Sequence, residues 1–446
     1  MKIYNLFPRL VGHFENWTPH LGRAAKMGFD WVYVNPIQRL GRSRSLYSIA
    51  DHFAINETFV APNSARPPEE QVRAMIAEAE RRGLSMMIDL VINHCAKDSR
   101  LVLEYPDWFV REGDDVASAF CVEADGNKVV WHDLAQFDHR HSVDRSGLLA
   151  YCIQVVDYLV DLGFRGFRCD AAYQIPNAVW ESLITHTRQI CPEVVFIAET
   201  LGCSPEQTRD TASAGFNAIF NSSKWWDFEA PWLLEQYDLT RHLASSISFP
   251  ESHDTERLFS ESGDNPNALK QRYLFAALFS AGVMMPVGYE YGFRRRLNVV
   301  DTSPADWEAP NIDLTDFIAR TNQLKDQYPV FREDGPIERL EQANPAVLLL
   351  RKVSTEGLGT ALLALNKDPW NYQHLHIEDL YDLSGSTPPL RDVSPEWPMD
   401  YLPTPFEFEL GPGVGRVWVT TACTSDIEPR RGAGCAVADR WLTKEE

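Results

Sequence analysis

Along roughly the first 330 residues, short apolar runs rich in Val, Ile, Phe and Tyr alternate with segments of helical periodicity. This alternation predicts a parallel sheet wrapped by helices. Eight of the apolar runs are predicted to be strands, at residues 2–7, 31–36, 84–93, 164–170, 194–200, 216–222, 245–254 and 282–290.

Two of the intervening segments carry a clear helical stripe. In residues 67–83 apolar side chains recur at helical spacing, between a proline pair that favours a helix start and Gly83, which favours a helix end. Residues 146–163 repeat the pattern. The stripes consist of Val72, Met75, Ile76 and Ala79 in the first segment and Leu148, Leu149, Cys152, Val155, Val156 and Leu159 in the second.

Eight strands with helices between them, in about 300 residues, predict a (β/α)8 TIM barrel. A doubly wound open sheet is the alternative, but no GxGxxG or phosphate-loop motif accompanies it. A long polar and aromatic stretch after the third strand predicts a functional loop or a small inserted subdomain. Later apolar runs separated by Pro, Gly, Asn and Asp predict an antiparallel β-sandwich. The predicted organisation is a barrel of residues 1–94 and 143–335, an insertion of 95–142, a C-terminal β domain of 336–420 and a disordered tail of 421–446.

The composition narrows the range of partners. The formal net charge is −21, from 63 acidic and 42 basic residues, so we expect no nucleic-acid partner and no anionic membrane partner. No apolar run reaches the roughly 18 residues of a membrane span, and the first residues lack the features of a secretory signal. The eight cysteines form no CxxC pair, which predicts reduced thiols in a cytoplasmic protein and argues against a zinc site. The sequence gives no indication of oligomeric state.

In a barrel of this kind the functional side chains stand at the carboxyl ends of the strands. A single Asp there is usually a helix cap. Carboxylates at four strand ends are costly to bury unpaired, so a shared functional site is the simpler interpretation. The strand-end residues are Asp89, Asn93 and His94 after the third strand, Arg168 and Asp170 after the fourth, Glu199 after the fifth, and His253 and Asp254 after the seventh.

This set of side chains suits glycoside cleavage. One carboxylic acid protonates the leaving oxygen and a second carboxylate attacks the sugar or activates water, through an oxocarbenium-like transition state. Arg168, two residues before Asp170, lies on the same strand face and can lower the pKa of that carboxyl. Histidines can donate hydrogen bonds to sugar hydroxyls.

The segments around these residues resemble a known family. Four of them are similar, in order and usual spacing, to the conserved segments of the alpha-amylase superfamily, glycoside hydrolase family thirteen. They are DLVINH (89–94), GFRCDAA (166–172), FIAET (196–200) and FPESHD (249–254). SLYSIADHFAIN (45–56) and GVMMPVGYE (282–290) are similar to two further barrel segments. Six segments in order are specific, and they cover the chain to about residue 330.

The resemblance implies a role for each matching residue. Asp170 matches the nucleophile, Glu199 the general acid/base and Asp254 the stabiliser of the transition state. The insertion at 95–142 matches domain B, which forms one wall of the cleft. The matching substrate-binding residues are Arg168, which orients the nucleophile, His94 and His253, which bind sugar hydroxyls, and Tyr47, which stacks on the sugar.

The resemblance implies a retaining glycoside hydrolase acting on alpha-glucosidic bonds of alpha-glucans or small alpha-glucosides in carbohydrate metabolism. The alternative is an alpha-glucan transglycosylase, a glucosyl- or maltosyltransferase with the same covalent intermediate. Where amylases often have Lys-His after the nucleophile, this chain has Tyr173 and Gln174. This departure, with Leu46 before Tyr47, is more typical of small-substrate or transferase branches. The stretch NHCAKDSRLVLEYPDWF is similar to maltosyltransferases that use maltose 1-phosphate, which are longer and differ after the nucleophile.

Calcium is a separate question. Asn93 and Asp133 match two positions that bind structural calcium in amylases, and oxygen ligands suit this hard cation. The histidine usually found after the nucleophile is missing, and Asn93 can instead tie domain B to the barrel by hydrogen bonds. We therefore favour a protein without metal or other cofactor, with calcium as the alternative.

Two further classes of protein compete with this interpretation. Some members of the superfamily are catalytically dead binding subunits, but all three carboxylates are present here. A metal-dependent aldolase or isomerase would need an inward-facing metal cluster or a lysine at a strand end, and we see neither. For Tyr47 the alternative is a packing role. If it contacts the sugar, we expect the ring face to act and the hydroxyl to be dispensable.

Overall fold

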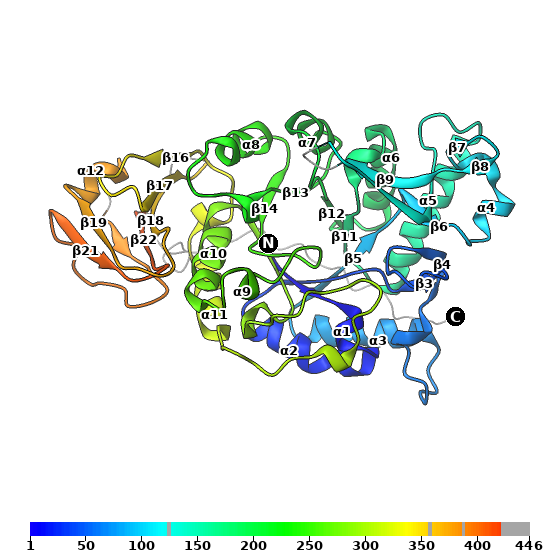
Figure 1. Cartoon of the computed structure of the whole chain (residues 1–446), viewed down its shortest axis with the longest axis horizontal. Coiled ribbons are helices and arrows are strands. Elements are labelled where there is room, and N and C mark those ends of the chain that lie inside the picture. Colours follow the sequence, from blue (N-terminus) through cyan, green and yellow to red (C-terminus); the bar gives the residue numbers. More distant parts are fainter. Residues whose placement is uncertain (123–125, 356–358, 386–388, 421–446) are drawn as a thin grey trace, which may run out of the picture.

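The computed structural model of the protein describes residues 1–122, 126–355, 359–385 and 389–420. Its centre is a closed barrel of parallel strands in the order β1-β15-β14-β13-β12-β11-β5-β2 (Figure 1). All eight predicted strands form the barrel, so the alternative of an open sheet is wrong. The strands are β1 (Lys2–Leu6), β2 (Trp31–Val34), β5 (Ser85–Leu90), β11 (Gly166–Cys169), β12 (Val195–Ala198), β13 (Ala218–Phe220), β14 (Ser245–Ser248) and β15 (Gly282–Pro286).

The predicted strands all extend too far at their carboxyl ends, most of all those matching β14, β15 and β5. β5 ends at Leu90 and β14 at Ser248, so residues 91–93 and 249–254 lie beyond the strands. An apolar run does not show where the hydrogen-bonded ladder stops, because buried loops can be apolar as well. Several of the predicted site residues therefore stand on loops at the rim of the barrel.

The barrel strands are covered on both faces by apolar side chains. Their outward side chains join the helices in one large core. Inward side chains form a second, smaller core inside the barrel, as expected for this fold. The residues of the inner core are Ile3, Tyr33, Met87, Ile197, Ala218, Phe220, Ile247, Phe249 and Met284.

The two predicted helices are confirmed. α3 (Pro68–Arg81) begins at the second proline of the pair and is followed by Gly83 at φ 75°, a left-handed conformation that glycine adopts without strain. α5 (Arg145–Leu162) is capped by Asp144 and ends at Gly163. The other helices are α1 (Pro8–Val11), α2 (Thr18–Lys26), α6 (Asn177–Ile190), α7 (Pro205–Ala212), α8 (Trp232–Thr240), α9 (Leu258–Glu261), α10 (Pro266–Phe279) and α11 (Thr315–Gln327). Within the described ranges, none has the length and apolar character needed to cross a bilayer.

Two segments extend from the rim of the barrel. The insertion after β5, domain B, is built on a three-stranded sheet in the order β6-β10-β9. A separate hairpin of β3 and β4 follows β2 and carries Tyr47 between its strands. Figure 1 shows both at the end of the molecule opposite the C-terminal domain. The elements are β3 (Gln38–Leu40), β4 (Ile49–Ile55), β6 (His94–Ala96), α4 (Leu101–Glu104), β7 (Arg111–Glu112), β8 (Asp115–Val116), β9 (Ser118–Val122) and β10 (Lys128–Gln136).

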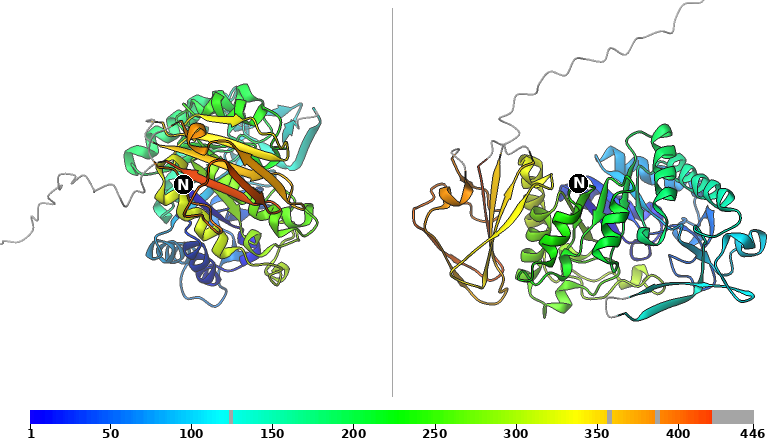
Figure 2. Two further views of the ribbon diagram at one scale, coloured as in Figure 1. Left: turned by 90° about the vertical axis from the view of Figure 1, so that its left-hand side faces the viewer. Right: turned by 90° about the horizontal axis from the view of Figure 1, so that it is seen from above.

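The C-terminal domain consists of antiparallel sheets, as predicted. Five strands pair in the order β16-β17-β18-β22-β20, and β19 pairs with β21. A core that includes Leu375, Phe406 and Trp418 joins the two sheets. The opposite face of the larger sheet packs on the barrel (Figure 2) and belongs to the main core. The elements are β16 (Ile337–Leu340), β17 (Val347–Val353), β18 (Thr360–Asn366), β19 (Gln373–Ile377), α12 (Leu380–Ser384), β20 (Arg391–Asp392), β21 (Phe406–Leu410) and β22 (Gly415–Val419). The predicted tail, 421–446, lies outside the described residues.

Candidate active site

The centre of the site is a buried arginine that is shared by two carboxylates. Arg168 is on β11, and its Nη1 donates to Asp170 Oδ1 at 2.5 Å and to Asp89 Oδ1 at 2.8 Å. Burial raises the pKa of both carboxyls, and Arg168 opposes this effect. The sequence predicted the direction of the effect of Arg168 on Asp170. It did not predict that one guanidinium is shared by two buried carboxylates. In both carboxyls the effect of burial on the pKa is larger than the opposing effect of Arg168.

Glu199 follows β12 and lies beside this pair. Its Oε1 accepts from the backbone N–H of Leu201 at 2.7 Å and its Oε2 from that of Ala171 at 3.0 Å. Burial raises the pKa of Glu199 to about 7, with Asp170 adding to the shift and Arg168 opposing it. A carboxyl with this pKa is protonated for much of the time near neutral pH, as a general acid requires.

Asp254 stands on the loop after β14, and its side chain is 59% exposed at the mouth of the barrel. The loop is held by a buried ion pair of Glu251 with Arg257 at 2.7 Å, and Arg296 donates to the Asp254 carbonyl at 2.7 Å. Some loss of hydration disfavours the charged carboxylate. The neighbouring His253, at 3.0 Å from Asp254 Oδ2, outweighs that loss and lowers the pKa of Asp254 to about 2.

Tyr47 is tied to the same network by its hydroxyl group. The hydroxyl donates to Asp89 Oδ2 at 2.7 Å, accepts from Asn35 Nδ2 at 3.0 Å and lies 2.6 Å from His253 Nε2. Its ring also stacks on the His253 imidazole, with the planes 11° apart. Because Asp89 takes the hydroxyl proton, the ring nitrogen of His253 must supply the hydrogen in their contact.

The two histidines predicted to bind sugar hydroxyls retain unused hydrogen-bonding atoms. Within the described residues, neither ring nitrogen of His94 nor Nδ1 of His253 makes a hydrogen bond, although all three atoms are buried. Burial lowers the pKa of His94 to about 4, against the opposing effect of the nearby Tyr47 backbone, so its ring is neutral. Buried polar atoms without partners are costly and suggest that a ligand completes them.

A small pocket lies between these groups. Its polar wall includes Arg168, Glu199, His253 and Asp254, and an apolar wall faces them. A larger hollow of about 380 Å³ between α2 and α3 lies away from these groups. The remaining residues of the site pocket are Tyr33, Leu201, Phe220, Phe249, Ser252 and Met284.

The structure brings together the residues predicted to act in catalysis or sugar binding, in one network or around one pocket, with one exception. His94 does not line the pocket and lies near Asp89 and the Tyr47 backbone. Three members of the network, Asp89, Tyr33 and Asn35, were not assigned a role from the sequence. Asp89 accepts from Tyr33 at 2.6 Å as well as from Tyr47 and Arg168. Asp89 begins the segment DLVINH, and Tyr33 occupies an inward position near the end of β2. Their positions at the carboxyl ends of barrel strands could have identified them from the sequence.

The two calcium candidates make separate contacts in the structure. Asn93 Nδ2 donates to Gln174 Oε1 at 2.9 Å, and Gln174 Nε2 donates to the Phe120 carbonyl of domain B at 3.0 Å. The Asp133 backbone carbonyl accepts from Lys97. In the part of the chain that the structure describes, neither Asp133 nor its neighbours belong to a cluster of three close His, Cys, Asp or Glu side chains. Through Asn93 and Gln174, a chain of amide hydrogen bonds connects domain B to the barrel.

Comparison with known proteins agrees with this geometry. The family model "Glycogen debranching enzyme, glucanotransferase domain" matches residues 1–110. An alpha-1,4-glucan:maltose-1-phosphate maltosyltransferase of Burkholderia pseudomallei is 28% identical over 380 residues, covering 82% of this chain and 33% of the relative. Its namesake from Myxococcus xanthus is 25% identical, covering 81% of this chain and 57% of the relative. The chain thus spans about a third to less than two thirds of these relatives.

Solved structures of alpha-amylases share the fold. The enzyme of Geobacillus thermoleovorans, complexed with acarbose, has a TM-score of 0.74 at 16% identity and covers 94% of this chain and 97% of its own. The enzyme of H. orenii has a TM-score of 0.75 at 16% identity and covers 94% and 99%. With the barrel, the C-terminal sheets and the sequence relatives taken together, the chain has the fold of the alpha-amylase superfamily, glycoside hydrolase family thirteen, and is similar in sequence to its transferases.

Proposed function

We propose that the protein is a retaining alpha-glucan transglycosylase that transfers glucosyl or maltosyl units by double displacement. The observation that carries the proposal is the pair of Asp170, fixed by Arg168, and Glu199, whose pKa of about 7 suits an acid. A carboxyl group held by an arginine, beside a second carboxyl group whose pKa is raised by burial, is what double displacement at a sugar needs.

In the first step Glu199 protonates the leaving oxygen while the Asp170 carboxylate attacks the anomeric carbon. The bond to the leaving group breaks and a covalent glycosyl-enzyme forms. In the second step Glu199, now ionised, removes the proton of an acceptor hydroxyl, which attacks the same carbon and releases Asp170. Two inversions retain the alpha configuration.

The other groups bind and orient the sugar. Asp254, held ionised by His253, faces the positive charge that develops on the sugar ring. The unused nitrogens of His94 and His253 offer hydrogen bonds to hydroxyls. Tyr47 lies at the same edge of the site, tied to His253. No step requires a metal, and we propose that the Gln174 amide chain substitutes for a structural cation.

Hydrolysis shares the first step and differs only in the acceptor. We favour transfer because the curated relatives that align over about four fifths of this chain are named as maltosyltransferases. Those names also make maltose 1-phosphate the first donor to test. The Tyr173-Gln174 pair, in place of the Lys-His common in amylases, is consistent with a smaller donor than starch.

The test is incubation with maltose 1-phosphate, maltose, maltodextrin, sucrose or trehalose, each with and without a glucan acceptor, followed by product chromatography and proton NMR. The proposal expects elongated alpha-glucans, acceptor-dependent turnover and an alpha anomer at the new bond. Free sugar released at the same rate with or without acceptor would identify a hydrolase. A beta product would contradict the double displacement itself.

A further inference from the structure

The outer face of the small sheet in the C-terminal domain carries an unusual group of side chains. β19 reads Gln373-His374-Leu375-His376-Ile377, and Leu375 and Ile377 are buried in the domain core. Since side chains alternate along a strand, His374 and His376 both point away from that core. On β21 the same alternation turns Glu407 and Glu409 outward.

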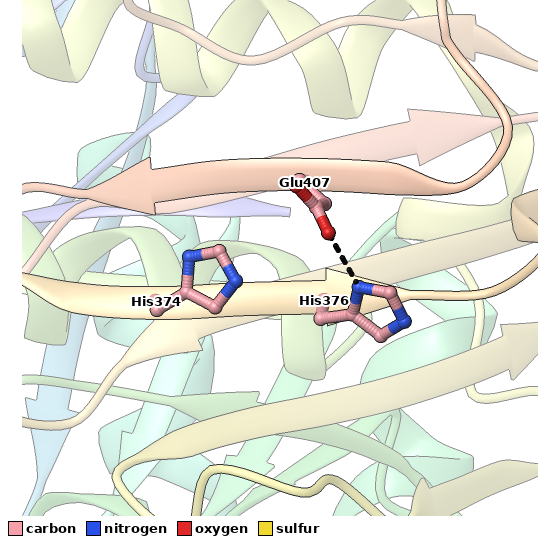
Figure 3. Close-up of side chains that lie close together, drawn as sticks. All are labelled: His374, His376 and Glu407. Atoms are coloured by element: carbon pink, nitrogen blue, oxygen red, sulfur yellow. Dashed lines mark hydrogen bonds and ion pairs between the residues drawn. The ribbon is translucent and has the colours of Figure 1, made fainter.

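The register of the two strands brings these side chains together. His376 pairs with Glu407, and His374 pairs with Glu409. One ligand atom each from His374, His376 and Glu407 lie within 4.8 Å of one another (Figure 3). His376 Nδ1 is 3.1 Å from Glu407 Oε1, so this contact is already a hydrogen bond.

We propose that His374, His376 and Glu407 form a zinc-type transition-metal site, with an open position for water. Two imidazoles and a carboxylate are a ligand set that zinc accepts, with bonds of about 2.0–2.2 Å. A tetrahedral ion with such bonds needs its ligands about 3.3 Å apart, so the side chains must close in by roughly 1–1.5 Å. The three side chains are partly or largely exposed and have room to turn toward a common centre.

The surroundings of His376 favour metal binding at Nδ1. Its other nitrogen, Nε2, lies 3.3 Å from Glu378 Oε1. An ion would take the place of the hydrogen that Nδ1 now shares with Glu407, while the proton on Nε2 stays with Glu378. A carboxylate on the far nitrogen of a metal-binding histidine fixes its tautomer and strengthens the bond.

The site is independent of the proposed catalytic function. It lies on the sheet of β19 and β21, whereas the catalytic network lies at the rim of the barrel. A metal there would pin the two strands to each other and raise the stability of the domain, because it binds only the folded register. The cysteine pattern gave no hint of it, since no ligand is a cysteine.

The test uses the full chain without an affinity tag, freed of metal and titrated with zinc chloride by calorimetry. Cobalt(II) serves as a spectroscopic probe of the coordination geometry. The proposal expects one zinc per chain at this site and a tetrahedral cobalt spectrum. His376→Ala and Glu407→Gln should each weaken zinc binding by tenfold or more, and Glu378→Gln by roughly tenfold.

Two variants serve as matched controls. Glu409→Gln removes the same charge from the same face of β21, and His242→Ala removes an exposed histidine elsewhere. Both should bind zinc as the unaltered chain does, and far-ultraviolet circular dichroism should show every variant folded. Equal zinc affinity in His376→Ala and Glu409→Gln, or no zinc bound by the unaltered chain, would overturn the proposal.

Discussion

At the scale of single residues, the roles of Asp170 and Glu199 lead to the first prediction. Asp170→Ala and Glu199→Gln should each lower kcat by at least about a thousandfold, because each removes a group that forms or breaks a bond. Melting temperatures should stay close to that of the unaltered chain. Removing a buried carboxylate loses its hydrogen bonds, but it also removes the repulsion between neighbouring carboxylates, and the two effects should offset each other. Kinetics and thermal unfolding measured together check both parts.

The matched control is Glu193→Gln, an exposed glutamate just before β12, at the end opposite Glu199. It should retain full activity. A glycosyl fluoride donor separates the two roles further, since its leaving group needs no proton. Glu199→Gln should form the covalent intermediate from that donor, and Asp170→Ala should not. Normal turnover in either variant with ordinary donors would contradict the assignment.

The raised pKa of Glu199 gives a second prediction. The acid must be protonated to act, so kcat/KM should fall above a pH of about 7, at roughly tenfold per pH unit. The cause is burial, which favours the neutral carboxyl. In Glu199→Gln the alkaline limb should disappear from the residual activity. If kcat/KM of this variant still falls at alkaline pH, a group other than Glu199 is responsible for the fall.

The third prediction revises what the sequence suggested for Tyr47. The ring face was expected to act, with the hydroxyl dispensable, but the hydroxyl contacts Asp89, Asn35 and His253. Tyr47→Phe takes a hydrogen bond from a buried carboxylate, which costs about 1.5 kcal/mol or more. When this loss of free energy destabilises the transition state, kcat drops roughly tenfold. Steady-state kinetics of Tyr47→Phe, with Tyr105→Phe as an exposed control in domain B, give the measurement. Unchanged kcat would restore the original interpretation.

The catalytic trio could be found from the sequence because each residue ends a strand within a recognisable segment. The same logic did not assign Asp89 a role, although it was among the strand-end residues. Its function depends on Tyr33, Tyr47 and Arg168, which reach it from three other parts of the chain. Spacing along a sequence does not show which distant side chains share one acceptor.

At the scale of elements, the barrel strands were predictable because they are apolar runs bounded by turns. α3 and α5 were predictable because each has one apolar stripe and residues typical of helix ends. The hairpin of β3 and β4 and the strands of domain B were not predicted individually. Their burial is irregular, with exposed positions such as Phe53 and Trp131, so no clean alternation marks them.

The connection between domain B and the barrel gives the fourth prediction. Gln174 bridges Asn93 and the Phe120 carbonyl with neutral amide groups, and we propose that this bridge takes the place of a structural ion. Metal-free protein should therefore gain no thermal stability from millimolar calcium. An ion bound at a hundred times its Kd would add about 2.7 kcal/mol, which thermal unfolding detects easily. A calcium-dependent rise in melting temperature would show that the amide chain does not replace the ion.

At the scale of the whole molecule, the barrel and the C-terminal domain share one core. Leu348, Leu350 and Val417 of the C-terminal sheet belong to the same apolar cluster as the barrel helices. The buried Lys352 ammonium also donates to the Phe279 carbonyl of α10. The two domains therefore stabilise each other directly.

The fifth prediction follows from that shared core. In urea, the fluorescence of the tryptophans and the far-ultraviolet circular dichroism should report one coincident transition. A chain ending at residue 335 should aggregate, because it exposes the apolar face that the sheet covers. Size-exclusion chromatography of that truncated chain provides the check. A monomeric, folded barrel without the C-terminal domain would show that the two parts are separable.

The position of α10 bears on how this protein can change over evolutionary time. The helix runs between the barrel and the C-terminal domain, and Gln271 donates to the Asn366 carbonyl of β18. Side chains around its whole circumference are buried, whereas α3 keeps an exposed face. Substitutions should accumulate freely along the outer stripe of α3 and hardly anywhere on α10. A lineage that exchanged its C-terminal domain would need compensating substitutions along α10 at the same time. We therefore expect α10 and the C-terminal domain to be inherited together.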